Sequence, residues 1–429
     1  MGKKGQRMSD CSQVIGSLSL RTTIFFIMLS ITCFQIEVEG RMRLSPSLDL
    51  STEYNDNIYW MRGKESDIIN RISPAISLSI PGYHKGLTLG YSAGFEFFVK
   101  NTDENTVTHR VNGEASYEAT ERLNLKLADT YVRSKSLSEI ELYGLRRRRE
   151  SYWQNSLIPS LDYTFGPNRV LSLGYRYIKS QFETYAYENS TEHSGNIGLI
   201  YGLNPHNILT LNYMFTHGQF AYYWGNLNRH LFEFSYEHIL NPRTSIIAST
   251  SYIRSGYTGI GTIDYQIYSA FLGLTKVITP YLNLSARGGY FIQDPEMGKR
   301  SSSFSGDFAI NYSRGRTRLG LSGEKAYTEV LFTTENLGFS TYWRILANAS
   351  RDIFRHWRIE VLGSYTKNHY IYAYADREDR FWTTGANISY SPVKWFRGML
   401  SYEHTRLDTT WLYEGYSVNR VILSLYFVY

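Results

Sequence analysis

Cysteine is nearly absent from this chain. Its 429 residues include two cysteines, Cys11 and Cys33, and both lie within the first 40 positions. If that segment is removed, the remaining chain has no thiol, which excludes disulfides, cysteine-ligated metal sites and thiol nucleophiles. The CxxCH motif is also missing, so no haem is covalently attached, and we expect no cofactor.

Long apolar runs and a strong charge imbalance are missing as well. After the first 40 residues no stretch approaches the roughly 20 apolar residues that a membrane helix needs, and the mean hydropathy is −0.33. The formal charge of +6 is modest and spread along the chain, which argues against a nucleic-acid partner. The ten histidines are scattered without metal-ligand spacing, so we expect no metal site.

The N-terminal segment has the pattern of a secretory signal peptide. Basic residues such as Lys3 precede an apolar stretch at 24–34 that is too short for a stable membrane anchor. We therefore predict a signal peptide at 1–40 and a single mature domain at 41–429. The alternatives are an uncleaved anchor and a lipoprotein attached through Cys33.

What the chain does contain is aromatic residues arranged with a period of two. Aromatics make up 16% of the sequence, including 37 Tyr, which is far richer in Tyr than an ordinary soluble domain. The last segment, VNRVILSLYFVY at 418–429, alternates two kinds of side chain. One face carries Val421, Leu423, Leu425, Phe427 and Tyr429, and the other carries Arg420, Ile422, Ser424 and Tyr426. Such alternation is typical of a strand between lipid and a polar lumen, and Phe427 with Tyr429 is the candidate C-terminal signal for a barrel-insertion machinery.

The same alternation repeats as hairpins along the chain. Tight turns rich in Pro, Gly and Asn recur roughly every 38 residues, the length of two membrane strands and one loop. They lie at 80–86, 166–169, 204–207, 241–244, 279–282, 314–317 and 391–394, with weaker turns near 120–121 and 352–356. The pattern predicts an all-β fold, a single antiparallel up-and-down transmembrane β-barrel of about 20 strands, or 18, with no plug domain. A soluble β-helix or propeller would not end its hairpins with aromatics at both rims.

Charged residues on these strands should face the lumen. A lipid-facing Arg or Lys at mid-membrane costs about 2–4 kcal/mol, so alternation assigns charges to the inner side. The pore-lining candidates are Asp49, Glu53, Glu96, Lys126, Arg176, Glu233, Glu237, Arg287, Arg318, Glu324, Arg358, Glu360 and Arg420. A barrel this wide cannot fill its centre with side chains, which predicts passive passage of small hydrophilic solutes.

Two surface features accompany the strands. The run Arg146, Arg147, Arg148 and Arg149 is predicted to lie at the surface, either as a collar that pairs with lipopolysaccharide phosphates or as a patch at the pore mouth that attracts anions. Tryptophans near loop ends are interpreted as anchors of an aromatic girdle. They are Trp60, Trp153, Trp224, Trp343, Trp382 and Trp411.

No catalytic constellation is evident, and we do not expect an enzyme. His193 and Ser194 are the only adjacent pair suited to an outer-membrane hydrolase, and neighbours on a strand point to opposite faces. Pro46, Pro74 and Pro159 fall inside predicted strands, which suggests a bend or bulge used more than once.

Residues 45–59, SPSLDLSTEYNDNIY, carry a resemblance to a known family. This opening strand, running into Tyr-Asn-Asp-Asn, resembles the outer-membrane β-barrel porin type 2 family, exopolysaccharide-associated outer-membrane β-barrel proteins. The resemblance implies a barrel in the outer membrane of a Gram-negative bacterium, with lipid, lipopolysaccharide and the insertion machinery as partners. It also implies a link to polysaccharide or export-complex proteins. The rival hypothesis is a non-conducting structural barrel of an exopolysaccharide or electron-transfer complex.

Overall fold

The fold is built almost entirely from β-strands. The computed structural model describes residues 42–135, 149–184, 189–221, 225–259, 264–330, 338–370, 377–410 and 415–429. Within these ranges lie twenty strands and one short 3-10 turn, η1 (Thr102–Glu104). No helix in this part of the chain is long and apolar enough to cross a membrane. The predicted signal peptide at 1–40 lies outside the described residues.

The strands follow one another along the chain with few interruptions. In order they are β1 (Arg43–Asn55), β2 (Asp67–Ile80), β3 (Lys85–Phe98), β4 (Thr106–Thr120), β5 (Leu123–Ser134), β6 (Tyr152–Gly166), β7 (Arg169–Phe182), β8 (Ser190–Asn204), β9 (Asn207–Phe220), β10 (Asn226–Asn241), β11 (Thr244–Tyr257), β12 (Tyr265–Thr279), β13 (Leu282–Pro295), β14 (Ser301–Arg314), β15 (Thr317–Val330), β16 (Gly338–Phe354), β17 (Trp357–Tyr370), β18 (Arg377–Val393), β19 (Phe396–Thr409) and β20 (Tyr416–Val428).

These strands close into a single barrel. Each pairs antiparallel with its neighbours in the chain, and β1 pairs with β20, from Ser47 opposite Val428 to Asn55 opposite Arg420. Closure removes the exposed strand edges that an open sheet would leave. The predicted antiparallel up-and-down barrel of about 20 strands is confirmed, and the alternative count of 18 is wrong.

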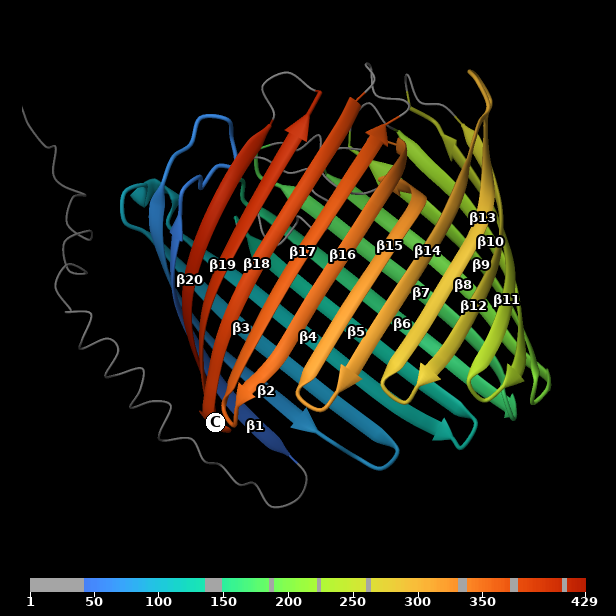
Figure 1. The fold of residues 1–429 in the computed structure, drawn as a ribbon, viewed down its shortest axis with the longest axis horizontal. Coiled ribbons are helices and arrows are strands. Elements are labelled where there is room, and N and C mark those ends of the chain that lie inside the picture. The colour runs from blue at the N-terminus through green and yellow to red at the C-terminus, as the bar shows by residue number, and fades with distance from the viewer. Residues whose placement is uncertain are drawn as a thin grey trace, which may run out of the picture.

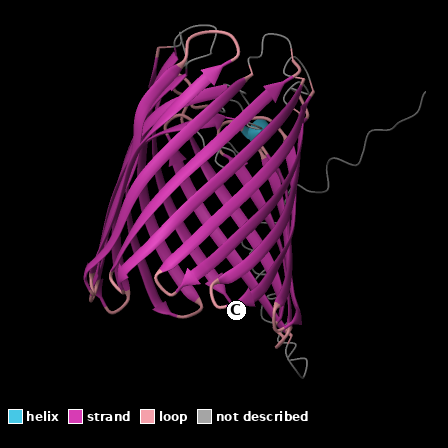
Figure 2. Cartoon of the chain, turned by 90° about the vertical axis from the view of Figure 1, so that its right-hand side faces the viewer, coloured by secondary structure: helices cyan, strands magenta, loops and turns pink. Residues whose placement is uncertain are grey.

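The two ends of the barrel differ. Figures 1 and 2 show tilted strands that are joined by short turns at one end and by longer connections at the other, with the C-terminus at the short-turn end. Most short turns coincide with the Pro- and Gly-marked segments of the sequence, for example between β6 and β7 and between β18 and β19. The turns between β4 and β5 and between β16 and β17 contain neither residue and lie at the weaker turns expected near 120–121 and 352–356. Among the described elements, only the strands and η1 are present, so no plug domain is seen there.

The prolines inside strands do not produce bulges. At Pro74 the pairing of β2 with β3 skips from Ile72 opposite Phe95 to Ala75 opposite Ser92, and the register is the same on both sides. The ladder of β6 and β7 likewise skips Pro159 without a shift. A bulge would insert a residue and displace the register. Of the two alternatives, the bulge is therefore wrong, because the missing proline N–H only interrupts the ladder locally. A bend at these prolines stays a prediction.

Contacts between distant strands identify the inner face of the barrel. The rings of Tyr265 on β12 and Phe291 on β13 lie 6.2 and 6.1 Å from that of Phe339 on β16, although neither strand neighbours β16. A barrel wall is convex outside, so such contacts run through the interior. Cross-strand partners share a face, and the register therefore carries this inner face from Tyr265 and Phe291 around all twenty strands. The opposite face carries exposed apolar side chains such as Leu272 and Leu423.

The lumenal face as candidate functional site

All thirteen predicted lining residues lie on this inner face by register. The pairings that place them include Glu53 opposite Ile422, Lys126 opposite Ser116 and Glu360 opposite Ser350. The structure also supplies oppositely charged partners that the sequence did not assign. The pairs are Lys126 with Asp162 at 3.3 Å, Arg287 with Asp307 at 2.7 Å, Arg358 with Asp352 at 2.8 Å, Arg420 with Glu403 at 2.7 Å, and Arg176 with Glu192. Mixed charge therefore covers much of the inner wall.

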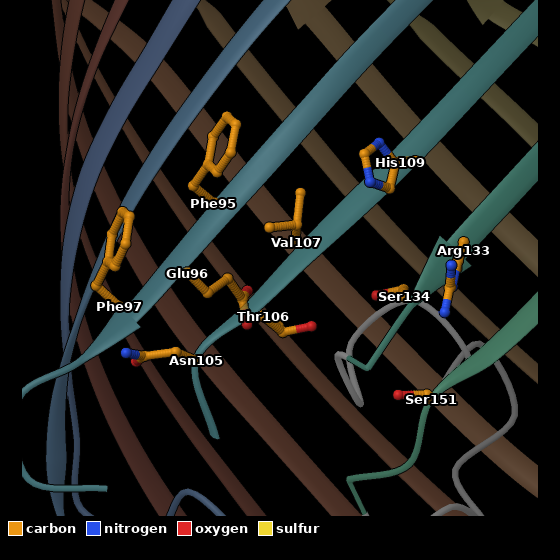
Figure 3. Close-up of a pocket in the computed structure, with 10 residues that line it drawn as sticks. All are labelled: Phe95, Glu96, Phe97, Asn105, Thr106, Val107, His109, Arg133, Ser134 and Ser151. Carbon is orange, nitrogen blue, oxygen red and sulfur yellow. The ribbon is translucent and has the colours of Figure 1, made fainter. Parts of the chain in front are cut away.

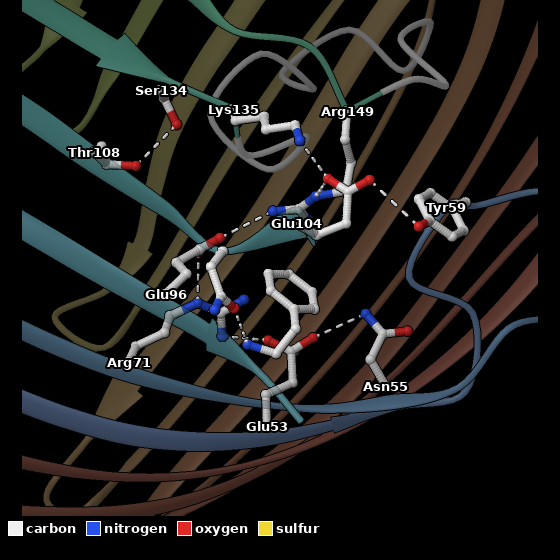
Figure 4. A network of polar contacts seen from close by, with 12 residues as sticks. Glu53, Asn55, Tyr59, Arg71, Glu96, Glu104, Thr108, Ser134, Lys135 and Arg149 are labelled. Carbon is white, nitrogen blue, oxygen red and sulfur yellow. Dashed lines mark hydrogen bonds and ion pairs between the residues drawn. The ribbon is translucent and has the colours of Figure 1, made fainter. Parts of the chain in front are cut away.

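Two of the predicted carboxylates are joined by an arginine that sequence reasoning missed. The guanidinium of Arg71 on β2 donates to Glu53 on β1 at 2.5 Å and to Glu96 on β3 at 2.8 Å. The side chains of Glu53 and Glu96 are 2% and 7% exposed. Figure 4 shows this cluster against the barrel wall. The period of two places Arg71 on the same face as Ser73 and could have identified it.

The ionic cluster continues into segments at the long-loop end of the barrel. Arg149 lies 3.0 Å from Glu96 and 3.5 Å from Glu104, and Lys135 lies 2.6 Å from Glu104. The Arg149 guanidinium also stacks 4.6 Å from the centroid of the Phe98 ring. Its side chain is 5% exposed, so its predicted place in a surface collar is wrong. The attraction of two carboxylates draws it inward, whereas Arg146 to Arg148 lie outside the described residues.

The first loop, residues 56–66, also folds into the barrel. Trp60 is 6% exposed and packs with Tyr416 and Val418, its ring 5.4 Å from that of Tyr416. Asn57 fixes the loop by donating from Nδ2 to the Ser417 carbonyl at 3.2 Å. Trp60 therefore does not belong to an outer girdle, and that prediction is wrong for this residue. A hydrophobic side chain in a loop fits either place, and only the path of the loop decides between them.

A small recess opens in the inner wall beside the ionic cluster. Its volume is about 360 Å³. The lining combines the guanidinium groups of Arg71, Arg110 and Arg420 with the carboxylates of Glu53 and Glu96 and the hydroxyls of Ser51, Ser73, Ser92 and Thr108. Charges of both signs and several hydroxyls thus face the same space. This surface suits hydrated polar solutes and shows no single sign of charge.

A second cavity, of about 440 Å³, lies at the ends of β3, β4 and β5. Figure 3 shows its lining residues, which include Phe95 and Phe97 as well as Glu96. Successive residues of a strand point to opposite faces, so this lining belongs to both sides of the wall. The cavity is therefore a notch at the rim and not a compartment of the lumen.

The part of the inner wall formed by β11 and β12 carries no charged side chain, in contrast to the ionic cluster. The inner-face residues of β11 and β12 are Ser, Ile, Tyr, Phe, Gly, Thr and Val, from Ser245 to Tyr257 and from Tyr265 to Val277. Charged side chains are thus confined to other sectors of the described wall. We call the inner faces of β11 and β12 the neutral sector.

The structure brings no catalytic group together at the predicted pair. His193 points outward and its Nδ1 lies 2.7 Å from the Tyr175 hydroxyl. Ser194 points inward, donates to Glu192 at 2.6 Å and lies 2.9 Å from the Thr216 hydroxyl. The two side chains are on opposite faces, as alternation predicted. Among the described residues, no group of three or more His, Cys, Asp or Glu side chains is placed to hold a metal ion.

Comparison with known proteins shows the same fold in solved structures but does not identify a family. No family model matches the chain, and no curated protein matches it by sequence. The FrpB iron transporter from Neisseria meningitidis (F5-1 variant) is 8% identical, with a TM-score of 0.58 over 90% of this chain and 82% of that one. The siderophore receptor PirA from Acinetobacter baumannii is 9% identical, with a TM-score of 0.54 over 92% and 81%. At such low identity these likenesses show a common barrel fold alone.

Proposed function

We propose that this protein is an outer-membrane channel through which small hydrophilic solutes pass passively. The observation that carries the proposal is the partition of side chains across a closed wall. Large apolar residues are exposed on the outer face, and charged and hydroxyl-bearing residues cover most of the inner face. This arrangement suits lipid outside and water inside.

A belt on the outer face supports a membrane location. Three tyrosine hydroxyls lie within hydrogen-bond distance of a histidine Nδ1 on the next strand, and each tyrosine is the seventh residue of its strand from the short-turn end. The pairs are Tyr91 with His109 at 2.9 Å, Tyr175 with His193 at 2.7 Å, and Tyr213 with His230 at 3.0 Å. Amphipathic rings collect where hydrocarbon meets headgroups. We infer that the belt marks the membrane boundary on the long-loop side.

The mixed charge of the lumen favours general hydrophilic solutes over one ionic class. Each strong positive charge in the ionic cluster is matched by a carboxylate, as in the contacts of Arg71 with Glu53 and Glu96. Matched charges largely cancel beyond a Debye length of about 8 Å at physiological salt. Weak overall ion selectivity is the expected consequence.

A finer assignment rests on the opening strand. The similarity of residues 45–59 to the type 2 porin family favours a barrel that works alongside exopolysaccharide export, in contact with lipopolysaccharide. The second candidate is a non-conducting barrel that anchors such a complex. Genes for glycosyltransferases beside the coding sequence would favour the polysaccharide link, and genes for multihaem proteins would favour an electron-transfer complex.

Planar-bilayer recording tests the channel directly. Purified protein, shown to be folded by its heat-dependent shift in gel mobility, should give stepwise ohmic conductance with weak preference between anions and cations. Boiled protein is the matched control. A folded barrel without conductance at any voltage would overturn the channel and leave the anchoring barrel.

A further inference from the structure

The end of one hairpin leaves the barrel wall. β14 and β15 are paired from Arg314 opposite Thr317 to Gly306 opposite Lys325. Within the described residues β15 continues beyond Lys325 and is paired there with β16 alone, from Ala326 opposite Tyr342 to Val330 opposite Gly338. We name these two segments, 326–330 and 338–342, the infolded hairpin end.

Side-chain contacts show which way this end turns. Tyr327 lies on the outer face of β15 by register, since its neighbour Ala326 is paired on the inner side with Tyr342. Its ring nevertheless lies 4.9 Å from that of Phe291, an inner-face residue of β13. Phe339 repeats the pattern, with Phe291 at 6.1 Å and Tyr265 at 6.2 Å. An outer-face residue reaches the inner face of other strands only when its own strand end has turned into the lumen.

The infolded hairpin end packs against the neutral sector of the inner wall. Phe339 is 0% exposed and shares a buried cluster with Ile253, Ile267 and Phe291. Aromatic and aliphatic contact of this kind needs an uncharged surface, and the inner faces of β11 and β12 supply one. The absence of charge in this sector therefore has a structural explanation.

β15 separates from β14 at a height where unpaired backbone groups can be exposed to water. The ladder of β14 and β15 holds for nine pairs, close to the 9–11 residues that a tilted strand needs to cross a bilayer. Unpaired N–H and C=O groups beyond that point can bind water, which they could not do in hydrocarbon. In Figure 1 β13 extends further at the long-loop end of the barrel than β15 and β16 do.

We propose that the infolded hairpin end is the size-selecting element of the pore mouth. It occupies part of the lumen at the long-loop end and limits the largest solute admitted from that side, and Tyr327 and Phe339 are its positioning residues. Its partly exposed inner-face side chains, Ala326, Thr328 and Tyr342, carry no charge at neutral pH. Exclusion should therefore depend on solute size and not on charge. The inference deepens the channel function proposed above.

Polymer exclusion in bilayers tests the proposal. Graded polyethylene glycols added on one side reduce conductance only when they enter the pore. The wild-type protein should exclude polymers from the long-loop side that it admits from the turn side, and Phe339→Ala should raise the long-loop cutoff toward the turn-side value. Phe304→Ala is the matched control, since Phe304 is 56% exposed on the outer face of β14. Equal cutoffs on both sides of the wild type, or an unchanged cutoff in folded Phe339→Ala, would overturn the proposal.

A labelling experiment separates this proposal from the channel function, because it needs no conductance. Ile267→Cys, in a background with Cys11→Ser and Cys33→Ser, places a thiol beneath the hairpin end, where Ile267 is fully buried. A membrane-impermeant maleimide should label it slowly, and at least tenfold faster when Phe339→Ala is added. Thr275→Cys, an exposed inner-face position near the turn end of β12, should react at the same rate in both backgrounds. If Phe339→Ala folds and does not accelerate the labelling of Ile267→Cys, the hairpin end does not cover this position and the proposal is refuted. If Phe339→Ala does not fold, Tyr327→Ala is used for the same test.

Discussion

Replacing Arg71 with methionine is the sharpest test of the lumenal ionic cluster. Methionine keeps the length and apolar stem of the side chain but removes the guanidinium that joins Glu53 and Glu96. Both carboxylates are nearly inaccessible to water, so neither can replace the lost partner by solvation. The change therefore leaves buried negative charge without its central counterion.

The expected loss can be worked from the contacts that survive. Breaking a buried ion pair by removing one partner costs about 3–5 kcal/mol. Glu96 keeps Arg149 at 3.0 Å and Glu53 keeps the Asn55 amide at 2.9 Å, which places the expected cost at the lower end, about 3 kcal/mol. That corresponds to roughly a hundredfold change in the folding equilibrium, since 1.36 kcal/mol is tenfold.

Equilibrium unfolding by urea in lipid vesicles measures this loss. The matched control is Arg287→Met, because Arg287 pairs with Asp307 at 2.7 Å on the same inner face but is 49% exposed. Exposed ion pairs contribute about 0–1 kcal/mol, so the control should cost about 2 kcal/mol less than Arg71→Met. Adding Glu53→Gln to Arg71→Met should restore part of the loss. Equal costs for the two single variants would refute the buried-cluster argument.

Three further predictions concern loops and turns. Burial alone would raise the pKa of Asp56, but hydrogen bonds from Lys64 and Asn419 outweigh it and hold the pKa below its ordinary 3.8. The stabilising contact of the Asp56 carboxylate is therefore fully present above pH 3.8 and is lost as the pH falls through the lowered pKa. Hydrogen exchange of the first loop should accelerate in that pH range in the wild type, and Asp56→Asn should show no such step. Asn168 has a φ of +52° in the turn between β6 and β7, so Asn168→Val should destabilise by about 1–2 kcal/mol in urea unfolding, whereas Asn168→Gly should not. Replacing the arginines at 146–148 with neutral residues should lower the preference of the pore for anions, measured as the reversal potential in a low-salt gradient. An unchanged reversal potential would favour the lipopolysaccharide collar.

The sequence alone determined the barrel and the two faces of its wall. Alternation with a period of two is a local property, because successive side chains on a strand point to opposite faces whatever the rest of the chain does. The prediction of about 20 strands followed from the spacing of turns such as those at 166–169 and 241–244. The charged residues of the strands, from Asp49 to Arg420, were assigned to one face by the same rule.

Only the tertiary structure decided what happens inside the barrel. Trp60 was predicted in an outer girdle and Arg149 in an exposed run at the collar or the pore mouth. Both side chains are buried inside because their partners, Tyr416 and Glu96, come from distant parts of the sequence. The same holds for Phe339, whose contacts with β12 and β13 cross the lumen. A period of two tells which face a residue occupies on its strand, but not when a strand end or loop turns inward. That choice depends on ring packing and charge pairing between segments that meet only after the barrel has closed.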